Sequence, residues 1–129
     1  MKKSHSLALA LLTGVGLGAL GVHALYAQAK PPVYYVAEID VTNKDGYLKD
    51  FAPKSQAAVR AGGAKILAIS TSPMSLIGPP PESRIVIQQW DSMEQMKAWF
   101  DSPAQTELRA VQAKYSKVRA YAVTGLPPK

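Results

Sequence analysis

The sequence has 129 residues, no cysteine, two histidines and a formal net charge of +6 at pH 7. This length suits one domain, and the absence of cysteine excludes disulfide bonds. The 15 basic residues are scattered and form no block of like charges, so nucleic acid is not an expected partner.

The chain begins with the pattern of a secretory signal peptide. Two lysines precede an apolar run over residues 7–25, and Ala27-Gln28-Ala29 fits a small-x-small cleavage site. We therefore expect a signal peptide, residues 1–29, and a periplasmic or secreted domain, residues 30–129. The alternative is an uncleaved leader that anchors the protein to the inner membrane, because 7–25 just reaches the roughly 18 residues that can span a bilayer. Only in that case is the membrane an expected partner.

Both histidines, His5 and His23, fall within this leader, so residues 30–129 contain neither histidine nor cysteine. Their absence excludes a Ser-His-Asp or Cys-His nucleophile, a histidine-ligated haem and the usual zinc sites. We expect no metal and no cofactor in the exported domain.

The first half of the domain predicts a strand, a helix and a second strand. Val33–Val41 has the two-residue periodicity of a strand, and residues 46–61 carry apolar side chains near one helical stripe. Pro53 is expected to kink or interrupt this helix, and Gly62-Gly63 to end it. A second strand follows over Ala64–Ser70.

The second half predicts a proline-rich loop, a strand, a helix in two pieces and a last strand. The loop covers residues 71–83 and is followed by a strand over Arg84–Trp90. Ser92 with Gln95, and then Ser102 with Gln105, fit two capping boxes, so the helix is expected to start and then restart. The fourth strand is expected over Lys117–Gly125.

The order β-α-β-β-α-β predicts an α+β, ferredoxin-like fold, with helices on one face of a four-stranded antiparallel sheet. Both alternating sets of side chains on the first and third strands include bulky apolar residues, so the uncovered face would expose a large apolar patch. Packing this face against a second copy would remove the patch, which predicts a homodimer. Three apolar loop residues, Met74, Leu76 and Ile77, are expected to form either a lid over a pocket or a dimer contact.

Two stretches of the domain carry a family resemblance: "YYVAEIDVTNKDGYLKDFAPKSQAAVRAGGAKILA" and "SRIVIQQWDSMEQMKAWFDSPAQTELRAV". They resemble the bacterial domain of unknown function family 1330, in the dimeric α+β barrel superfamily, over about residues 33–125. The Gly62-Gly63 pair and "SMEQMKAWFDSPAQTEL" are the most specific pieces. The resemblance implies the dimeric α+β barrel fold and carries no established activity.

Seven side chains are expected to share one face of the sheet, because the first and third strands are neighbours in this fold. These candidates for ligand binding are Tyr34, Glu38, Arg84, Gln88, Trp90, Arg119 and Tyr121. A carboxylate and a guanidinium within aromatic walls would suit a small organic acid or phenol. Glu38 and Arg84 are also the candidates for catalysis, with Glu38 as a general base. In the alternative interpretation, Glu38 and Arg84 form a cross-strand ion pair and the aromatic residues belong to the core.

The residues therefore leave two function classes open, beside a purely structural role. The first is an exported, non-catalytic dimer that binds a small, partly apolar organic ligand in a sheet pocket. The second is a cofactor-free enzyme, monooxygenase- or isomerase-like, acting on an activated phenol or enol, which the superfamily resemblance permits.

Overall fold

The computed structural model describes residues 30–129. The predicted signal peptide, residues 1–29, and its alternative as a membrane anchor lie outside the described residues. Pro31–Lys129 form a structural unit of their own. Within the described part of the chain, no helix is long and apolar enough to cross a membrane.

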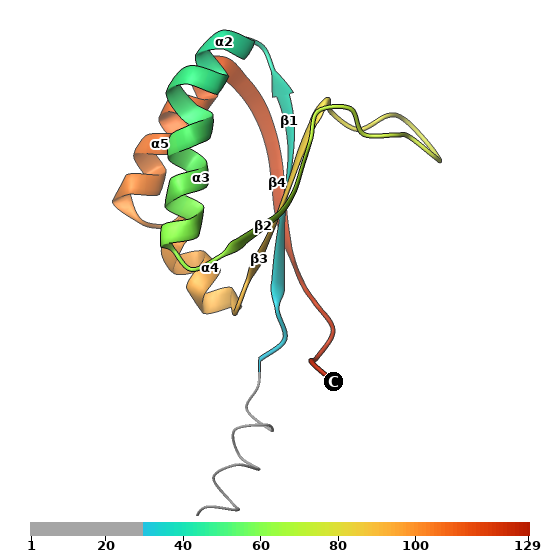
Figure 1. Ribbon diagram of the computed structural model, residues 1–129, viewed down its shortest axis with the longest axis vertical. Helices are drawn as coiled ribbons and strands as arrows, with labels where there is room; N and C mark the ends of the chain where they lie inside the picture. The colour runs from blue at the N-terminus through green and yellow to red at the C-terminus, as the bar shows by residue number, and fades with distance from the viewer. Residues whose placement is uncertain (1–29) are drawn as a thin grey trace, which may run out of the picture. The chain divides into compact units, whose positions relative to one another are not determined.

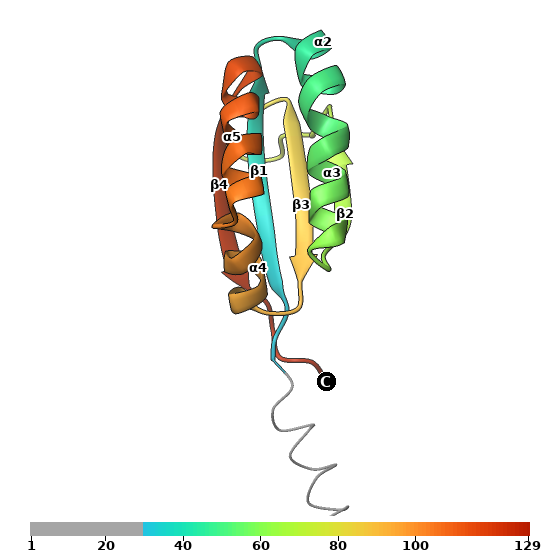
Figure 2. The same ribbon diagram turned by 90° about the vertical axis from the view of Figure 1, so that its left-hand side faces the viewer.

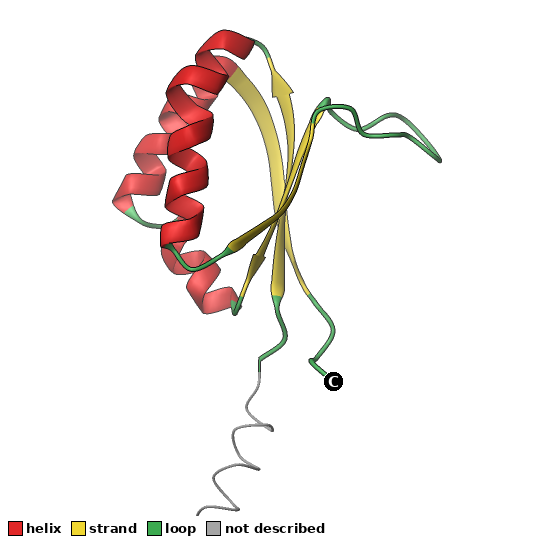
Figure 3. Ribbon diagram, viewed as in Figure 1, coloured by secondary structure: helices red, strands yellow, loops and turns green. Residues whose placement is uncertain are grey.

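The elements follow the order that the sequence predicts (Figures 1 and 3). The strands are β1 (Val33–Val41), β2 (Lys65–Ser70), β3 (Arg84–Trp90) and β4 (Ser116–Thr124). The first helical segment consists of α2 (Lys44–Gly46), a π-helical turn η1 (Tyr47–Phe51) and α3 (Ala52–Ala61), and the second consists of α4 (Met93–Phe100) and α5 (Pro103–Tyr115). The predicted α+β, ferredoxin-like order is confirmed, and the strand bounds differ from the expected ones by one residue at β2 and β4.

The four strands form one antiparallel sheet in the order β2-β3-β1-β4. The helices lie on one face of this sheet, and no described segment covers the other (Figures 1 and 2). Ile39 of β1 lies opposite Arg84 of β3, and Glu38 lies opposite Arg119 of β4. Because directly opposed residues share a face, this register decides which side chains point toward the helices.

Pro53 lies inside the first helical segment, and the chain accommodates it with a wide turn. The segment begins at Asn43, whose side-chain oxygen accepts a hydrogen bond from the backbone N–H of Gly46 at 3.0 Å. Pro53 has no N–H to donate to the preceding turn, and the N–H of Ala52 donates to the carbonyl of Tyr47, five residues earlier. The expected interruption is therefore a π turn, and its first residue, Tyr47, is buried.

The two predicted capping boxes are only half formed. Ser92 Oγ accepts a hydrogen bond from the backbone N–H of Gln95, and Ser102 Oγ accepts one from Gln105. The reciprocal bonds are missing: Gln95 Oε1 accepts from the backbone of Asp91, and Gln105 Oε1 is buried without a partner among the described residues. Both serines are N-caps as expected, whereas the side chain of Gln105 is buried in the interior instead of reaching back along the helix.

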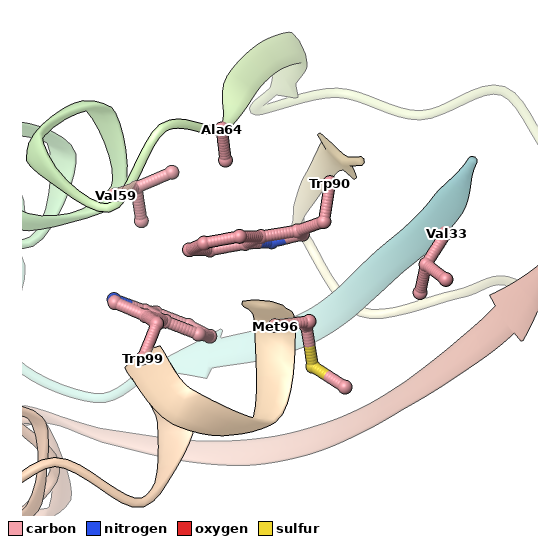
Figure 4. Packing of buried hydrophobic residues seen from close by; sticks show 6 residues of the cluster. All are labelled: Val33, Val59, Ala64, Trp90, Met96 and Trp99. Carbon is pink, nitrogen blue, oxygen red and sulfur yellow. The ribbon is translucent and has the colours of Figure 1, made fainter. Parts of the chain in front are cut away.

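Trp90 and Trp99 lie at the centre of the larger core cluster (Figure 4). Their ring centroids are 4.8 Å apart, and the surrounding buried residues are Val33, Val59, Ala64 and Met96. Trp90 is completely buried, so this packing contributes several kcal/mol, on the scale of about 3–5 kcal/mol for truncating a core tryptophan. Trp90 is therefore a core residue.

The face of the sheet away from the helices, here called the open face, carries an apolar group beside charged and polar residues. By register, its apolar side chains include Tyr34, Val36, Ile85, Ile87, Tyr121 and Val123, and its polar ones include Glu38, Asp40, Gln89, Lys117 and Arg119. The loop over residues 71–83, here called the arm, leaves the sheet on this same side (Figures 1 and 2). The open face and the arm thus lie on one side of the protein, and the helices lie on the other.

Candidate functional site

The seven candidate site residues do not share one face of the sheet. Three of them, Arg84, Gln88 and Trp90, lie opposite Ile39, Tyr35 and Val33 on the face toward the helices. The other four lie on the open face: Tyr34, Glu38, Arg119 and Tyr121. The expectation of one common pocket is therefore wrong, because Glu38 is opposite Ile85 in the observed register, and a shift of one residue moves a side chain to the other face.

Glu38 forms an ion pair on the open face with Arg119, not with Arg84. Arg119 Nε donates a hydrogen bond to Glu38 Oε2 at 3.0 Å, and Arg119 Nη2 donates to the same oxygen. This hydrogen bond raises the pKa of Arg119 above its usual range. The pair is an ordinary cross-strand contact whose guanidinium is largely exposed, which is the kind of pair that contributes little to stability.

Arg84 lies at the start of β3, on the face toward the helices, and it is 9% exposed. Its guanidinium carbon lies 5.0 Å from the ring centroid of Tyr47, in a cation–π contact. Arg84 Nε is buried and has no hydrogen-bond partner, and no ion pair to Arg84 is found within residues 30–129. The guanidinium of Arg84 therefore has the side chain of Tyr47 as a neighbour but no carboxylate partner within the described residues.

A pocket of about 320 Å³ opens beside Arg84. Its lining residues come from the ends of β1, the first helical segment and the two ends of the arm: Val41, Lys44, Tyr47, Leu48, Thr71, Ser83 and Arg84. This lining contains two cations, three hydroxyl groups, an aromatic ring and aliphatic carbon, but no carboxylate. The pocket can therefore hold a small ligand with a negatively charged end and an apolar body.

Two small cavities, of about 30 and 40 Å³, adjoin this pocket at Tyr47, between the helices and the sheet. Gln88 lines both cavities, and its Oε1 accepts a hydrogen bond from Trp90 Nε1 at 3.0 Å. Trp99 Nε1 and Gln105 Oε1, on residues that line the larger of the two, are buried without partners among the described residues. The interior behind Arg84 is thus polar, although its cavities hold no more than a water-sized group.

Tyr47 remains a neutral phenol at neutral pH. Burial raises its pKa above the ordinary value of 10.0, and the positive charge of Arg84 opposes that rise. Burial also raises the pKa of Tyr35, against the positive charge of Arg109. Neither phenol supplies a negative charge, so the pocket beside Arg84 stays positive.

Lys44, Thr71 and Ser83 were not expected from the sequence to line a pocket, and Tyr47 was expected only on the apolar stripe of a helix. The sequence did contain an indication of this pocket, because Arg84 is the first residue of its predicted strand. A residue at a strand end meets the neighbouring strand end and the adjoining loops. Among residues 30–129, no cluster of three or more histidine, cysteine, aspartate or glutamate residues is placed to hold a metal ion.

One family model matches the chain, over residues 32–126, and it describes a domain of unknown function (DUF1330). The comparison with curated proteins finds no match for this chain.

Several solved structures have a similar fold. A protein of unknown function from Rhodopseudomonas palustris aligns with a TM-score of 0.60 and 14% identity, covering 84% of this chain and 94% of that one. A protein of unknown function from Bacteroides thetaiotaomicron aligns at 0.53 and 12% identity, covering 74% and 99%. A protein from Nitrosomonas europaea, provisionally assigned as an antibiotic biosynthesis monooxygenase, aligns at 0.52 and 10% identity, covering 77% and 94%. At these identities the similarities establish the fold alone.

Proposed function

The chain belongs to the DUF1330 family, and we propose that it is an exported homodimer that binds a small, partly apolar organic acid in the pocket beside Arg84. The observation that carries this proposal is the buried guanidinium without a carboxylate partner in residues 30–129. An uncompensated buried charge costs several kcal/mol, so a protein that keeps one requires a reason for it. A ligand carboxylate would supply the missing negative charge.

The rest of the pocket lining supports the same class of ligand. A guanidinium holds a carboxylate through two parallel hydrogen bonds, and Lys44 adds a second positive charge at the rim. Val41, Leu48 and the ring of Tyr47 provide apolar contact for the body of the ligand. A volume of about 320 Å³ lies at the lower end of the range of small-molecule pockets, which suits a ligand with one aromatic ring.

The geometry favours binding over catalysis. A cofactor-free monooxygenase or isomerase acting on an activated phenol or enol needs a group that accepts a proton from the substrate. Glu38 is the candidate for that role, but it lies on the open face in an ion pair with Arg119, whereas Arg84 lies on the face toward the helices. The two candidate catalytic residues therefore cannot act on one substrate in this pocket.

The binding proposal is tested with pairs of ligands that differ only in charge. We would measure the melting temperature with benzoate, 4-hydroxybenzoate, cinnamate and hexanoate, each against its neutral amide, and follow any shift by calorimetry. We expect a carboxylate to stabilise the protein, by about 2.7 kcal/mol when its concentration is 100 times its dissociation constant, and the matching amide to have no effect.

Arg84→Met should abolish this response, and Arg119→Met is the matched control. Arg119 is an exposed arginine on the open face, so its removal should leave ligand binding unchanged. If every carboxylate and its amide act alike, or if Arg84→Met still responds, the pocket does not bind an organic acid.

Export is tested by measuring the intact mass of the protein and the cell fraction in which it is found. Cleavage after Ala29 predicts a mature chain that begins at Lys30 and is recovered from the periplasm or the medium. An intact mass that includes residues 1–29, with the protein in the membrane fraction, would support the uncleaved anchor instead.

A further inference from the structure

We propose that the arm, residues 71–83, is a clasp that grips the second copy of the protein in the homodimer. This inference rests on the proposed homodimer and adds a second contact surface to the open face. It also selects the dimer contact over the lid as the role of the apolar residues in the arm.

The arm carries three large apolar side chains in almost complete exposure. Met74, Leu76 and Ile77 are 82%, 84% and 96% exposed, more than any large apolar side chain of the sheet. Isolated apolar residues on a surface are ordinary, but three within four positions at the tip of a projecting loop mark a contact site. They touch no wall of the pocket beside Arg84, whose lining includes only the two ends of the arm, Thr71 and Ser83.

The arm has a defined shape that presents these side chains outward. Ser75 Oγ donates a hydrogen bond to the carbonyl of Gly78 at 3.2 Å across the tip. Gly78 has a positive φ of 80°, which favours glycine, and no atom lies within 4 Å of the position where a Cβ would stand. Three consecutive prolines, residues 79–81, then stiffen the return toward β3.

The reach of the arm exceeds the gap between two packed sheets. Half of its residues, at about 3.1 Å for each extended residue, span roughly 19 Å, whereas packed sheets lie about 10 Å apart. Figures 1 and 2 agree that the arm projects on the side of the open face. With a second copy on the open face, the tip would therefore pass the facing sheet and lie along the flank of that copy.

The open face by itself presents a modest area for a stable dimer. Four strands spaced about 4.8 Å apart and about seven residues long, at about 3.3 Å per residue, present roughly 440 Å² on each copy. The flat footprints of two such faces add up to roughly 900 Å², which is a lower bound on the accessible surface that they would bury, and typical stable interfaces bury about 1,200–2,000 Å². The arm supplies additional apolar area, and two-fold symmetry would use it twice.

The arm and the open face form one continuous surface. A hollow of about 390 Å³ lies between the base of the arm, at Pro80, Pro81 and Glu82, and the charged end of the open face, at Glu38 and Arg119. A partner on the open face would also meet the base of the arm. This continuity extends the proposed homodimer interface from the open face onto the arm.

The first test measures the dimer dissociation constant of the full chain by sedimentation equilibrium. We expect the triple variant Met74→Ser, Leu76→Ser, Ile77→Ser to weaken the dimer by about 100-fold or more. Leu126→Ser is the matched control, because Leu126 is 86% exposed but lies outside the arm. Neither change removes a core contact, so the circular dichroism spectrum and the melting of the monomer should be unchanged.

The second test uses the absence of cysteine from the chain. Ile77→Cys and, as a control, Leu126→Cys each introduce a single thiol that can carry a benzophenone photo-crosslinker. Mixing ¹⁵N-labelled and unlabelled protein before irradiation distinguishes cross-links between copies from those within one copy. We expect the probe at position 77 to give mixed-isotope cross-linked peptides at high yield.

The outcomes separate this inference from the proposal on which it rests. If the wild-type protein is a monomer at micromolar concentration, the homodimer fails and the clasp fails with it. If the wild-type protein is a dimer whose dissociation constant the triple variant leaves unchanged, or if position 77 cross-links only within its own copy, the clasp alone is wrong.

Discussion

Arg84 is expected to lower the stability of the fold while it serves ligand binding. The guanidinium is buried against the ring of Tyr47, and Arg84 Nε has no hydrogen-bond partner among the described residues. A buried arginine without a carboxylate partner lowers stability, and proteins keep such costs where function requires them, whereas a structural arginine would be expected to have an acidic partner. This difference makes the two roles separable by a stability measurement.

We expect Arg84→Met to keep or raise the free energy of unfolding, by up to about 1–4 kcal/mol, because methionine fills the space without a charge to desolvate. Chemical unfolding with urea, in the absence of ligand, measures the change. A loss of more than about 3 kcal/mol would assign Arg84 a structural role instead.

The tyrosines make the fold sensitive to alkaline pH. Burial raises the pKa of Tyr47 and Tyr35 above 10.0, and a hydrogen bond to Asp50 does the same for Tyr115. Above pH 10 the unfolded chain therefore loses these protons before the folded one does. The stability present below pH 10 is then lost as the pH rises toward the folded-state pKa values.

We expect Tyr47→Phe to reduce this alkaline loss, since phenylalanine cannot ionise in either state. Urea unfolding between pH 7 and pH 11 would compare the slopes of the variant and the wild type. Equal slopes would mean that Tyr47 has the same pKa in both states.

Among the elements, the first helical segment depends on one glycine. A Cβ at Gly46 would collide with the ring of Tyr115. That ring cannot move away freely, because its hydroxyl donates a hydrogen bond to Asp50 at 2.8 Å, from the end of α5 to η1. The ring of Tyr115 therefore packs the second helical segment directly against Gly46 of the first.

We expect Gly46→Ala to destabilise the protein by about 1–3 kcal/mol, although alanine favours a helix over glycine by about 1 kcal/mol. In a Tyr115→Ala background the collision is absent, so the same change should become neutral or stabilising. Urea unfolding of the four proteins in this double-mutant cycle measures the coupling. Additive effects would contradict the contact.

For the whole molecule, the proposed homodimer depends on the open face. Val36 and Ile87 lie opposite each other near its middle, and Tyr121 and Val123 are nearly half exposed. A single copy leaves this apolar surface in water, while two copies would cover it for each other.

We expect Ile87→Glu to weaken the dimer by about 100-fold or more while the monomer stays folded, because the introduced carboxylates would be buried at the interface. Ala57→Glu, on the exposed side of α3, is the control for added charge. Sedimentation equilibrium measures both. A tight Ile87→Glu dimer would place the interface elsewhere.

Much of the fold follows from local pattern. The two-residue period of Val33–Val41 and the caps at Ser92 and Ser102 predicted elements within a residue of their observed ends. The π turn before Pro53 was less accessible, because proline forbids one hydrogen bond without specifying which alternative replaces it. The candidate site was only partly predictable, because the face to which a strand residue points depends on the register of the whole sheet.

The sequence by itself determined the order of the elements, the helix starts, and the absence of histidine and cysteine from residues 30–129. Those features depend on neighbours along the chain. Only the tertiary structure decided that Glu38 pairs with Arg119 while Arg84 turns toward the helices. The side chains of a strand alternate between two faces, so a register change of one residue reverses them, and that register is set by the packing of the whole sheet against its helices.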